Sequence, residues 1–306
     1  MSTVDVASDF ARSILHVYWI VTWTAGVIAA VVFGLLGWVL VRFRARPGAP
    51  LPRQTRGHTL LEIGWTVAPA LVLLLIAIPT IQVIFRTQAT GVPRGALEVT
   101  VRGFQWWWEF RYAGLDVVTA NELHVPAGRP VVLHLEGPDV IHSFWVPRLG
   151  GKRDVVPGRA NRLGFTADTP GEYWGQCAEF CGISHANMRL RVIVDSPEAF
   201  ERWVAAQRAP AAEPAGEAAE GKTLYAATAC VGCHTIRGVS AGQLGPDLTH
   251  FGSRHTLAAG LLPNTPANVA AWIRNPAALK PGAKMPGLGL TEAQAGAIAA
   301  YLASLK

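Results

Sequence analysis

The stretch Cys-Ala-Glu-Phe-Cys-Gly-Ile-Ser-His-Ala-Asn-Met occupies residues 177–188 and decides what the middle of this chain folds around. It places four side chains with soft donor atoms close together, namely Cys177, Cys181, His185 and Met188. A His-Ser-Phe-Trp stretch that begins at His142 can add another imidazole across the fold. Thiolate, imidazole and thioether ligands favour copper, and a weak Met ligand is typical of electron-transfer copper. The pattern therefore predicts a copper electron-transfer centre.

Two other interpretations of Cys177 and Cys181 fit less well. Structural zinc sites usually contain Cys-x-x-Cys pairs and four closed ligands, whereas these cysteines are four residues apart. A disulfide between them would suit an oxidising compartment. That disulfide would leave His142, His185 and Met188 without a role, so we favour the metal site.

A second motif, Cys-Val-Gly-Cys-His at residues 230–234, contains the remaining two of the four cysteines. Its spacing is typical of covalent haem attachment, with Cys230 and Cys233 bonded to the haem and His234 as an iron ligand. Apart from Met188 and the initiator, the only methionine is Met285, which is the candidate for the other axial ligand. His and Met ligation raises a haem potential, which suits a donor to copper. The competing interpretation, a thioredoxin-like thiol pair, requires a strand-helix-strand context that the sequence lacks.

Two long uncharged runs lie near the N-terminus, from Ile14 to Val41 and from Ile63 to Phe85. Each exceeds the roughly 20 residues that an α-helix needs to cross a bilayer. The first run is also much longer than the apolar segment of a cleaved signal peptide, which is about 7–15 residues. We expect both runs to be retained as transmembrane helices, although a longer precursor remains open.

The connector between these runs is basic, with arginines at positions 42, 44, 46, 53 and 56 and no acidic residue before Glu62 at its end. The positive-inside rule places this connector in the cytoplasm. The N-terminus and everything after Phe85 then lie on the outer face of a bacterial inner membrane. The net charge of +6 arises partly from this topology and partly from a basic C-terminal part. No feature of the sequence indicates a nucleic-acid-binding fold.

The rest of the chain divides by composition. Short runs rich in Val, Leu, Phe and Trp predict antiparallel strands of a small sandwich at 97–112, 130–135, 161–167 and 188–194. A helix at 196–207, with Ser196 as N-cap and Pro197 at its first position, closes that unit. The Ala, Pro and Glu-rich segment 209–220 predicts a linker. The expected domains are a helical hairpin (1–86), a β-domain (87–208) and an all-α domain (221–306).

Over roughly residues 10–205 these motifs resemble the second subunit of haem-copper cytochrome c oxidases. The resemblance implies a cupredoxin-like Greek-key sandwich that holds a dinuclear copper A centre. It implies that Cys177 and Cys181 bridge the two coppers and that four further groups complete the site: His142, His185, Met188 and the backbone carbonyl of Glu179. With an all-α domain of the class I cytochrome c type at the C-terminus, the order of parts resembles the fused second subunit of caa3-type oxidases.

The resemblance also suggests roles for three other groups. In Gln-Trp-Trp-Trp-Glu-Phe at 105–110, Trp106 matches the residue through which electrons reach copper, while Trp107 and Trp108 are expected to pack in the core. Glu62, at the start of the second apolar run, matches the mouth of a proton channel, although an acid there could simply offset the helix dipole. The carboxylate of Glu179 would help to bind a magnesium ion shared with a partner subunit.

The function that the resemblance implies is electron delivery to a proton-pumping oxidase. The expected partners are a catalytic subunit I, a subunit III, and a c-type cytochrome or quinol–cytochrome c reductase complex as donor. An alternative is the corresponding subunit of a copper A-containing nitric oxide reductase. A periplasmic copper carrier would need neither a covalent haem nor two membrane helices, and quinol oxidase subunits lack the copper ligands.

Overall fold

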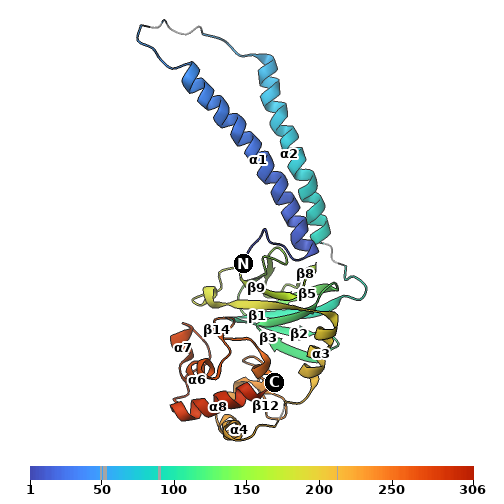
Figure 1. Ribbon diagram of the computed structural model, residues 1–306, viewed down its shortest axis with the longest axis vertical. Coiled ribbons are helices and arrows are strands. Elements are labelled where there is room, and N and C mark those ends of the chain that lie inside the picture. The colour runs from blue at the N-terminus through green and yellow to red at the C-terminus, as the bar shows by residue number, and fades with distance from the viewer. Residues whose placement is uncertain (49, 51–53, 89–90, 212) are drawn as a thin grey trace. The chain divides into compact units, whose positions relative to one another are not determined.

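The computed structural model describes residues 1–48, 50, 54–88, 91–211 and 213–306. It divides into two compact units, one formed by residues 12–89 and the other by residues 1–11 and 90–306. The first unit contains the two long helices, and the second contains a β-domain and a helical domain (Figure 1). Arg53 of the predicted cytoplasmic connector and residue 212 of the predicted linker lie outside the described residues.

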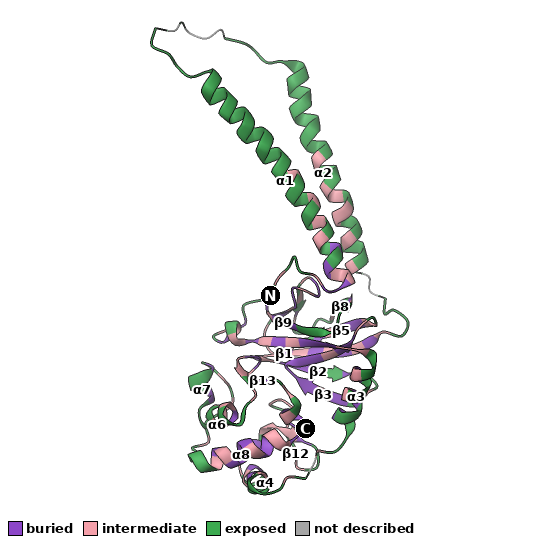
Figure 2. Cartoon of the chain, viewed as in Figure 1, coloured by how far each residue is buried: buried purple, intermediate pink, exposed green. Residues whose placement is uncertain are grey.

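The two apolar runs form helices α1 (Asp9–Arg42) and α2 (Thr59–Thr87). Each helix begins four to five residues before the predicted run. At about 1.5 Å per residue, their 34 and 29 residues span about 51 and 44 Å, more than the roughly 30 Å of a bilayer core. Figure 2 shows both helices exposed over most of their length, as expected if lipid rather than protein covers their apolar side chains.

The β-domain is a sandwich of two five-stranded sheets. One sheet has the order β3 (Val117–Ala120), β2 (Trp107–Tyr112), β1 (Leu97–Phe104), β5 (Pro130–Glu136) and β8 (Asn161–Thr166). The other has the order β4 (Glu122–Pro126), β10 (Arg189–Asp195), β9 (Gly171–Cys177), β6 (His142–Trp145) and β7 (Arg153–Val155). The prediction of antiparallel strands is wrong for two pairs, since β1 pairs parallel with β5 and β10 pairs parallel with β4. Alternate residues of β1 are buried, because successive side chains of a strand point to opposite faces. Helix α3 (Pro197–Arg208) closes the domain, and Ser196 caps it as predicted.

The predicted strand 97–112 is in fact two strands joined by a tight turn. Strands β1 and β2 pair antiparallel with Phe104 opposite Trp107, so Gln105 and Trp106 form the turn between them. The aromatic run concealed this turn because it contains no Gly or Pro. The turn removes Trp106 from the sheet, while Trp107 stacks on Phe104 and Trp108 is fully buried against Phe144.

The N-terminal segment before α1 is part of the β-domain. Ser8 forms a β-bridge with Ala167, and its hydroxyl donates a hydrogen bond to the carbonyl of Leu149. Asp9 accepts a hydrogen bond from the backbone N–H of Thr166. Residues on both sides of the membrane hairpin in the sequence therefore contribute to one folded domain.

The C-terminal domain is mainly helical, as predicted, with two very short strand pairs that were not predicted. Its elements are α4 (Glu217–Ala227), α5 (Cys230–Cys233), β11 (Thr235–Ile236), β12 (Ser240–Ala241), η2 (Phe251–Ser253), β13 (Thr256–Leu257), β14 (Leu262–Pro263), α6 (Pro266–Arg274), α7 (Pro276–Leu279) and α8 (Glu292–Ser304). Helix α4 begins inside the predicted linker. It packs closely on α8, and a Cβ atom at Gly221 would lie 1.9 Å from the carbonyl oxygen of Ala297.

Candidate metal and haem centres

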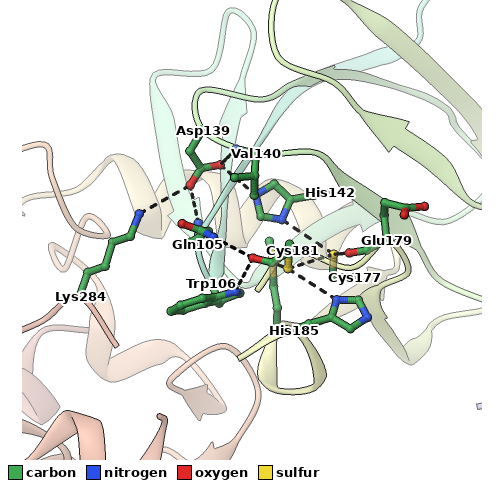
Figure 3. Close-up of polar contacts among 11 residues, drawn as sticks. Gln105, Trp106, Asp139, Val140, His142, Cys177, Glu179, Cys181, His185 and Lys284 are labelled. Atoms are coloured by element: carbon green, nitrogen blue, oxygen red, sulfur yellow. Dashed lines mark hydrogen bonds and ion pairs between the residues drawn. The ribbon is translucent and has the colours of Figure 1, made fainter. Parts of the chain in front are cut away.

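The copper motif of residues 177–188 and His142 come together at one end of the second sheet. Cys177 ends β9 and His142 begins β6, so neighbouring parts of the sheet position both side chains. Cys177 Sγ lies 3.8 Å from Cys181 Sγ and 3.8 Å from His142 Nδ1. Potential ligand atoms of these three residues all lie within 4.8 Å of one another (Figure 3).

Three further groups face the two sulfur atoms. His185, in the short helix η1 (His185–Asn187), places Nδ1 3.5 Å from Cys181 Sγ. Met188 is fully buried and places its sulfur 3.8 Å from the same atom. The backbone carbonyl of Glu179 lies 3.2 Å from Cys177 Sγ, whereas its carboxylate points away from the cluster (Figure 3). All six predicted copper ligands therefore converge in one place.

The cysteines are free thiols, and the contacts around them favour a thiolate. A separation of 3.8 Å between Cys177 and Cys181 is far beyond a disulfide bond of about 2.05 Å. The hydrogen bond shared with Cys181, assisted by His142, holds the pKa of Cys177 well below its usual range, at about 4. The same contact, together with burial, raises the pKa of Cys181. A second buried thiolate would need a compensating cation, which a metal ion bound by soft ligands would supply.

Asp139 orients the His142 ring. Its carboxylate lies 2.9 Å from His142 Nε2 and leaves Nδ1 facing Cys177. Burial lowers the pKa of His142, but the hydrogen bonds to Asp139 and Cys177 outweigh burial, so its pKa is raised. Burial raises the pKa of Asp139, but hydrogen bonds from His142 and from two backbone N–H groups outweigh it and lower its pKa. A carboxylate behind a ligand histidine is a common means of fixing ring orientation and raising ligand basicity.

Trp106 contacts the cysteine loop directly. Its Nε1 donates a hydrogen bond of 2.9 Å to the carbonyl of Cys181, and the side chain of Gln105 donates to the same oxygen at 2.8 Å. The indole is 8% exposed. The predicted electron-transfer tryptophan is thus hydrogen-bonded to the backbone of a candidate copper ligand.

The haem motif lines a cavity of about 530 Å³. Cys230, Cys233 and His234 lie on its wall together with Met285, although Met285 is 51 residues after His234 in the chain. Most of the remaining lining is apolar or aromatic, which suits the body of a porphyrin. These residues fit a covalently attached haem with His and Met axial ligands.

The surroundings of the His234 ring favour the tautomer and the neutral state that bind a metal ion. Its Nδ1 lies 2.8 Å from the carbonyl of Pro246, and a hydrogen bond donated to that carbonyl would leave Nε2 as a free acceptor. Burial lowers the pKa of His234, which favours the neutral ring that binds iron. Gly245 is required beside the ring, because a Cβ atom there would lie 2.5 Å from its Cε1.

Glu62 lies in the first turn of α2, as the sequence predicts. Sequence reasoning missed other residues that the fold places at the sites, namely Asp139, Gln105, Glu122 and Lys280. The sequence contains one weak indication that Asp139 belongs to the copper site, since it precedes the predicted ligand His142 by three residues. The sequence contains no such indication for Glu122 or Lys280, because each side chain forms at least one hydrogen bond with a residue of another domain.

The fold and these sites define a class, that of membrane-anchored cupredoxin-like proteins that carry a cytochrome c domain. Residues 2–83 match the family model for the cytochrome c oxidase subunit II transmembrane domain, and residues 115–196 match the model for its periplasmic domain. Residues 218–306 match the cytochrome c model. The chain belongs to the cytochrome c oxidase subunit II family.

Two relatives with matches over most of the chain agree with this membership. Cytochrome c oxidase subunit 2 of Alkalihalophilus pseudofirmus is 38% identical over 286 residues, which cover 91% of this chain and 83% of the relative. The Bacillus sp. (strain PS3) protein of the same name is 34% identical and covers 86% of this chain and 80% of the relative. A solved periplasmic domain of subunit II from Bradyrhizobium japonicum is 31% identical, covers 39% of this chain and 97% of that chain, and has a TM-score of 0.37.

Proposed function

We propose that this chain receives electrons from an external donor on a haem attached to Cys230 and Cys233. The electrons then pass by way of Trp106 to a dinuclear copper A centre, and from there to the oxygen-reducing subunit I of a proton-pumping haem-copper oxidase. The observation that carries this proposal is the position of Trp106. Trp106 lines the haem cavity, and its indole N–H donates a hydrogen bond to the carbonyl of Cys181.

The proposed copper site uses the residues that converge around the two sulfur atoms. Cys177 and Cys181 would hold the two copper ions together with four further groups: His142, His185, Met188 and the carbonyl of Glu179. When bound, copper and haem supply the one-electron chemistry, and the protein fixes their positions. Burial of Cys177, Cys181 and Met188 limits water at the site, and packing of these side chains limits rearrangement on electron transfer.

The proposed topology places both termini outside a bacterial inner membrane. Because residues 7–9 bond to the β-domain, the N-terminus and the β-domain must lie on the same face. An even number of membrane crossings between them, α1 and α2, satisfies that requirement. The arginine-rich connector then lies in the cytoplasm, in agreement with the positive-inside rule.

The remaining roles concern partners. Subunit I would receive the electrons and subunit III would complete the assembly, while a c-type cytochrome or a quinol–cytochrome c reductase complex would supply them. The exposed Glu179 carboxylate, which points away from the copper cluster, is free to bind a magnesium ion at the subunit I interface. Glu62 would mark the mouth of a proton channel.

The test is gas consumption by the complex that co-purifies with this chain from its native membrane. The reduced complex is offered oxygen and nitric oxide separately. Cyanide-sensitive oxygen uptake is the expected result. Nitric oxide turnover without oxygen uptake would show that the chain belongs to a nitric oxide reductase. The proposed copper and haem sites would stand, and only the proposed catalytic partner would change.

A further inference from the structure

The cytochrome domain contacts the copper domain through a short segment that directly precedes Met285. This segment, Lys280-Pro281-Gly282-Ala283-Lys284, is called the contact loop here. Lys280 is 4% exposed, and its Nζ donates hydrogen bonds to the carbonyl of Trp106 at 2.6 Å and to that of Ala258 at 3.0 Å. A lysine from the haem domain therefore bonds the backbone of the tryptophan that contacts the copper loop.

Three other residues of the contact loop touch the copper domain, and one of them is Lys284, whose Nζ lies 3.9 Å from a carboxylate oxygen of Asp139 (Figure 3). Gly282 has φ of +79°, and a Cβ atom there would lie 3.0 Å from the Trp106 ring and 2.3 Å from Ile183. The carbonyl of Pro281 accepts a hydrogen bond from the buried hydroxyl of Ser184, which precedes His185. The backbone of the contact loop thus packs directly against both the Trp106 indole and the segment that carries the copper ligands.

Burial of the Lys280 amine costs free energy, because the charged group loses its hydration. Burial lowers the pKa of its amine to about 7. Within the described part of the chain, both hydrogen bonds that Nζ donates go to backbone carbonyls rather than to a carboxylate. Such poorly compensated polar groups can be retained because they specify one geometry among several.

We propose that Lys280 is a positioning residue that fixes Trp106 between the haem cavity and the copper loop. The inference rests on the proposed electron path and adds to it a residue from the haem domain. Lys280 donates a hydrogen bond to the backbone carbonyl of Trp106, while the carbonyl of Cys181 accepts the indole N–H. Met285, the proposed ligand of the haem iron, immediately follows the contact loop in the sequence.

A separate anchor allows docking to be distinguished from positioning. The buried carboxylate of Glu122, at the start of β4, accepts hydrogen bonds from the backbone N–H groups of His255 and Thr256 and from the Thr256 hydroxyl. These contacts join the same two domains but involve neither Trp106 nor the contact loop. Glu122→Gln is therefore a matched control that weakens docking and leaves the Lys280 contact in place.

The experiment measures the rate of haem-to-copper electron transfer in the intact oxidase complex after rapid reduction of the haem. Lys280→Leu removes the hydrogen bonds to Trp106 and Ala258 and adds no iron ligand. We expect it to slow transfer by about tenfold or more, as loss of a fixed geometry can do. The optical spectrum of the haem and the electron paramagnetic resonance spectrum of the copper should be unchanged. Lys280→Arg, which can still donate to the carbonyl, should recover part of the rate.

Three other results would contradict the proposal. A Lys280→Leu rate within twofold of the wild-type rate would overturn the positioning role, and the proposed path would stand if Trp106→Phe still slowed transfer. Equal slowing by Glu122→Gln would reduce Lys280 to an ordinary docking contact and would also overturn it. Absence of haem-to-copper transfer in the wild-type complex would overturn the proposed path and this inference together.

Discussion

Replacing Asp139 with Asn should weaken copper binding. In the structure one oxygen of Asp139 lies 2.9 Å from His142 Nε2 and accepts the N–H of Val140 at 2.7 Å, and the other accepts the N–H of Gln105 at 2.7 Å. An Asn side chain has one acceptor oxygen, so its NH₂ group must face one of these donors. It also removes the negative charge that makes His142 a more basic ligand.

The expected loss of affinity is about 10–100-fold, the usual effect of removing a carboxylate behind a ligand histidine. That loss corresponds to about 1.4–2.7 kcal/mol of binding free energy. Copper is titrated into the copper-depleted full-length chain in detergent, against a competing chelator, and its thiolate absorption is followed. Glu98→Gln is the matched control, because Glu98 lies 2.8 Å from Nε2 of His134, which is not among the proposed ligands.

The loss of copper affinity in Asp139→Asn should become smaller as the pH is lowered. Asp139 raises the pKa of His142 in the metal-free protein, so protons compete with copper at a higher pH in the wild type than in the variant. The affinity difference should therefore shrink as pH falls through the wild-type pKa of His142. Equal copper affinity in Asp139→Asn and Glu98→Gln at neutral pH would refute the orienting role of Asp139.

Three further predictions test the proposed electron path and the packing beneath it. Trp106→Phe removes the indole N–H that bonds to Cys181, so haem-to-copper transfer should slow while both spectra stay intact; an unchanged rate would remove Trp106 from the path. Met285→Ala should lower the reduction potential of the haem and change its optical spectrum, because no other methionine lines the cavity among the described residues. An unaltered spectrum and potential would show that another group binds the iron. Gly221→Ala should destabilise the cytochrome domain by about 3 kcal/mol or more in denaturant unfolding, since its Cβ would meet the Ala297 carbonyl. Gly296→Ala, with 3.9 Å of clearance in α8, should be neutral or slightly stabilising, and equal effects of the two changes would contradict the proposed packing.

Much of the candidate site was predictable because its ligands are chemically rare in this chain. With only four cysteines, each within a short motif, the sequence offers few ways to assign Cys177 or Cys230. The long uncharged runs were equally informative, because a bilayer imposes a minimum length that few soluble helices reach. The capped helix α3 followed from local signals at Ser196 and Pro197.

The features that sequence reasoning missed depend on contacts between distant segments. The turn at Trp106 is stabilised by Asp139, more than 30 residues away, rather than by a local Gly or Pro. Lys280 looks like an ordinary surface lysine in sequence, and only docking of the two domains buries it. The early start of α4 reflects its packing against α8 near the end of the chain.

The contribution of residues 1–11 to the β-domain has a practical consequence for preparing that domain without its membrane anchor. A fragment that begins after α2 would lack the partner of Ala167 and the segment that covers Leu149. The exposed strand edge would then be available to pair with another molecule. A detergent-free version should therefore retain the first eleven residues, joined by a short flexible connection to residue 91 in place of the two helices.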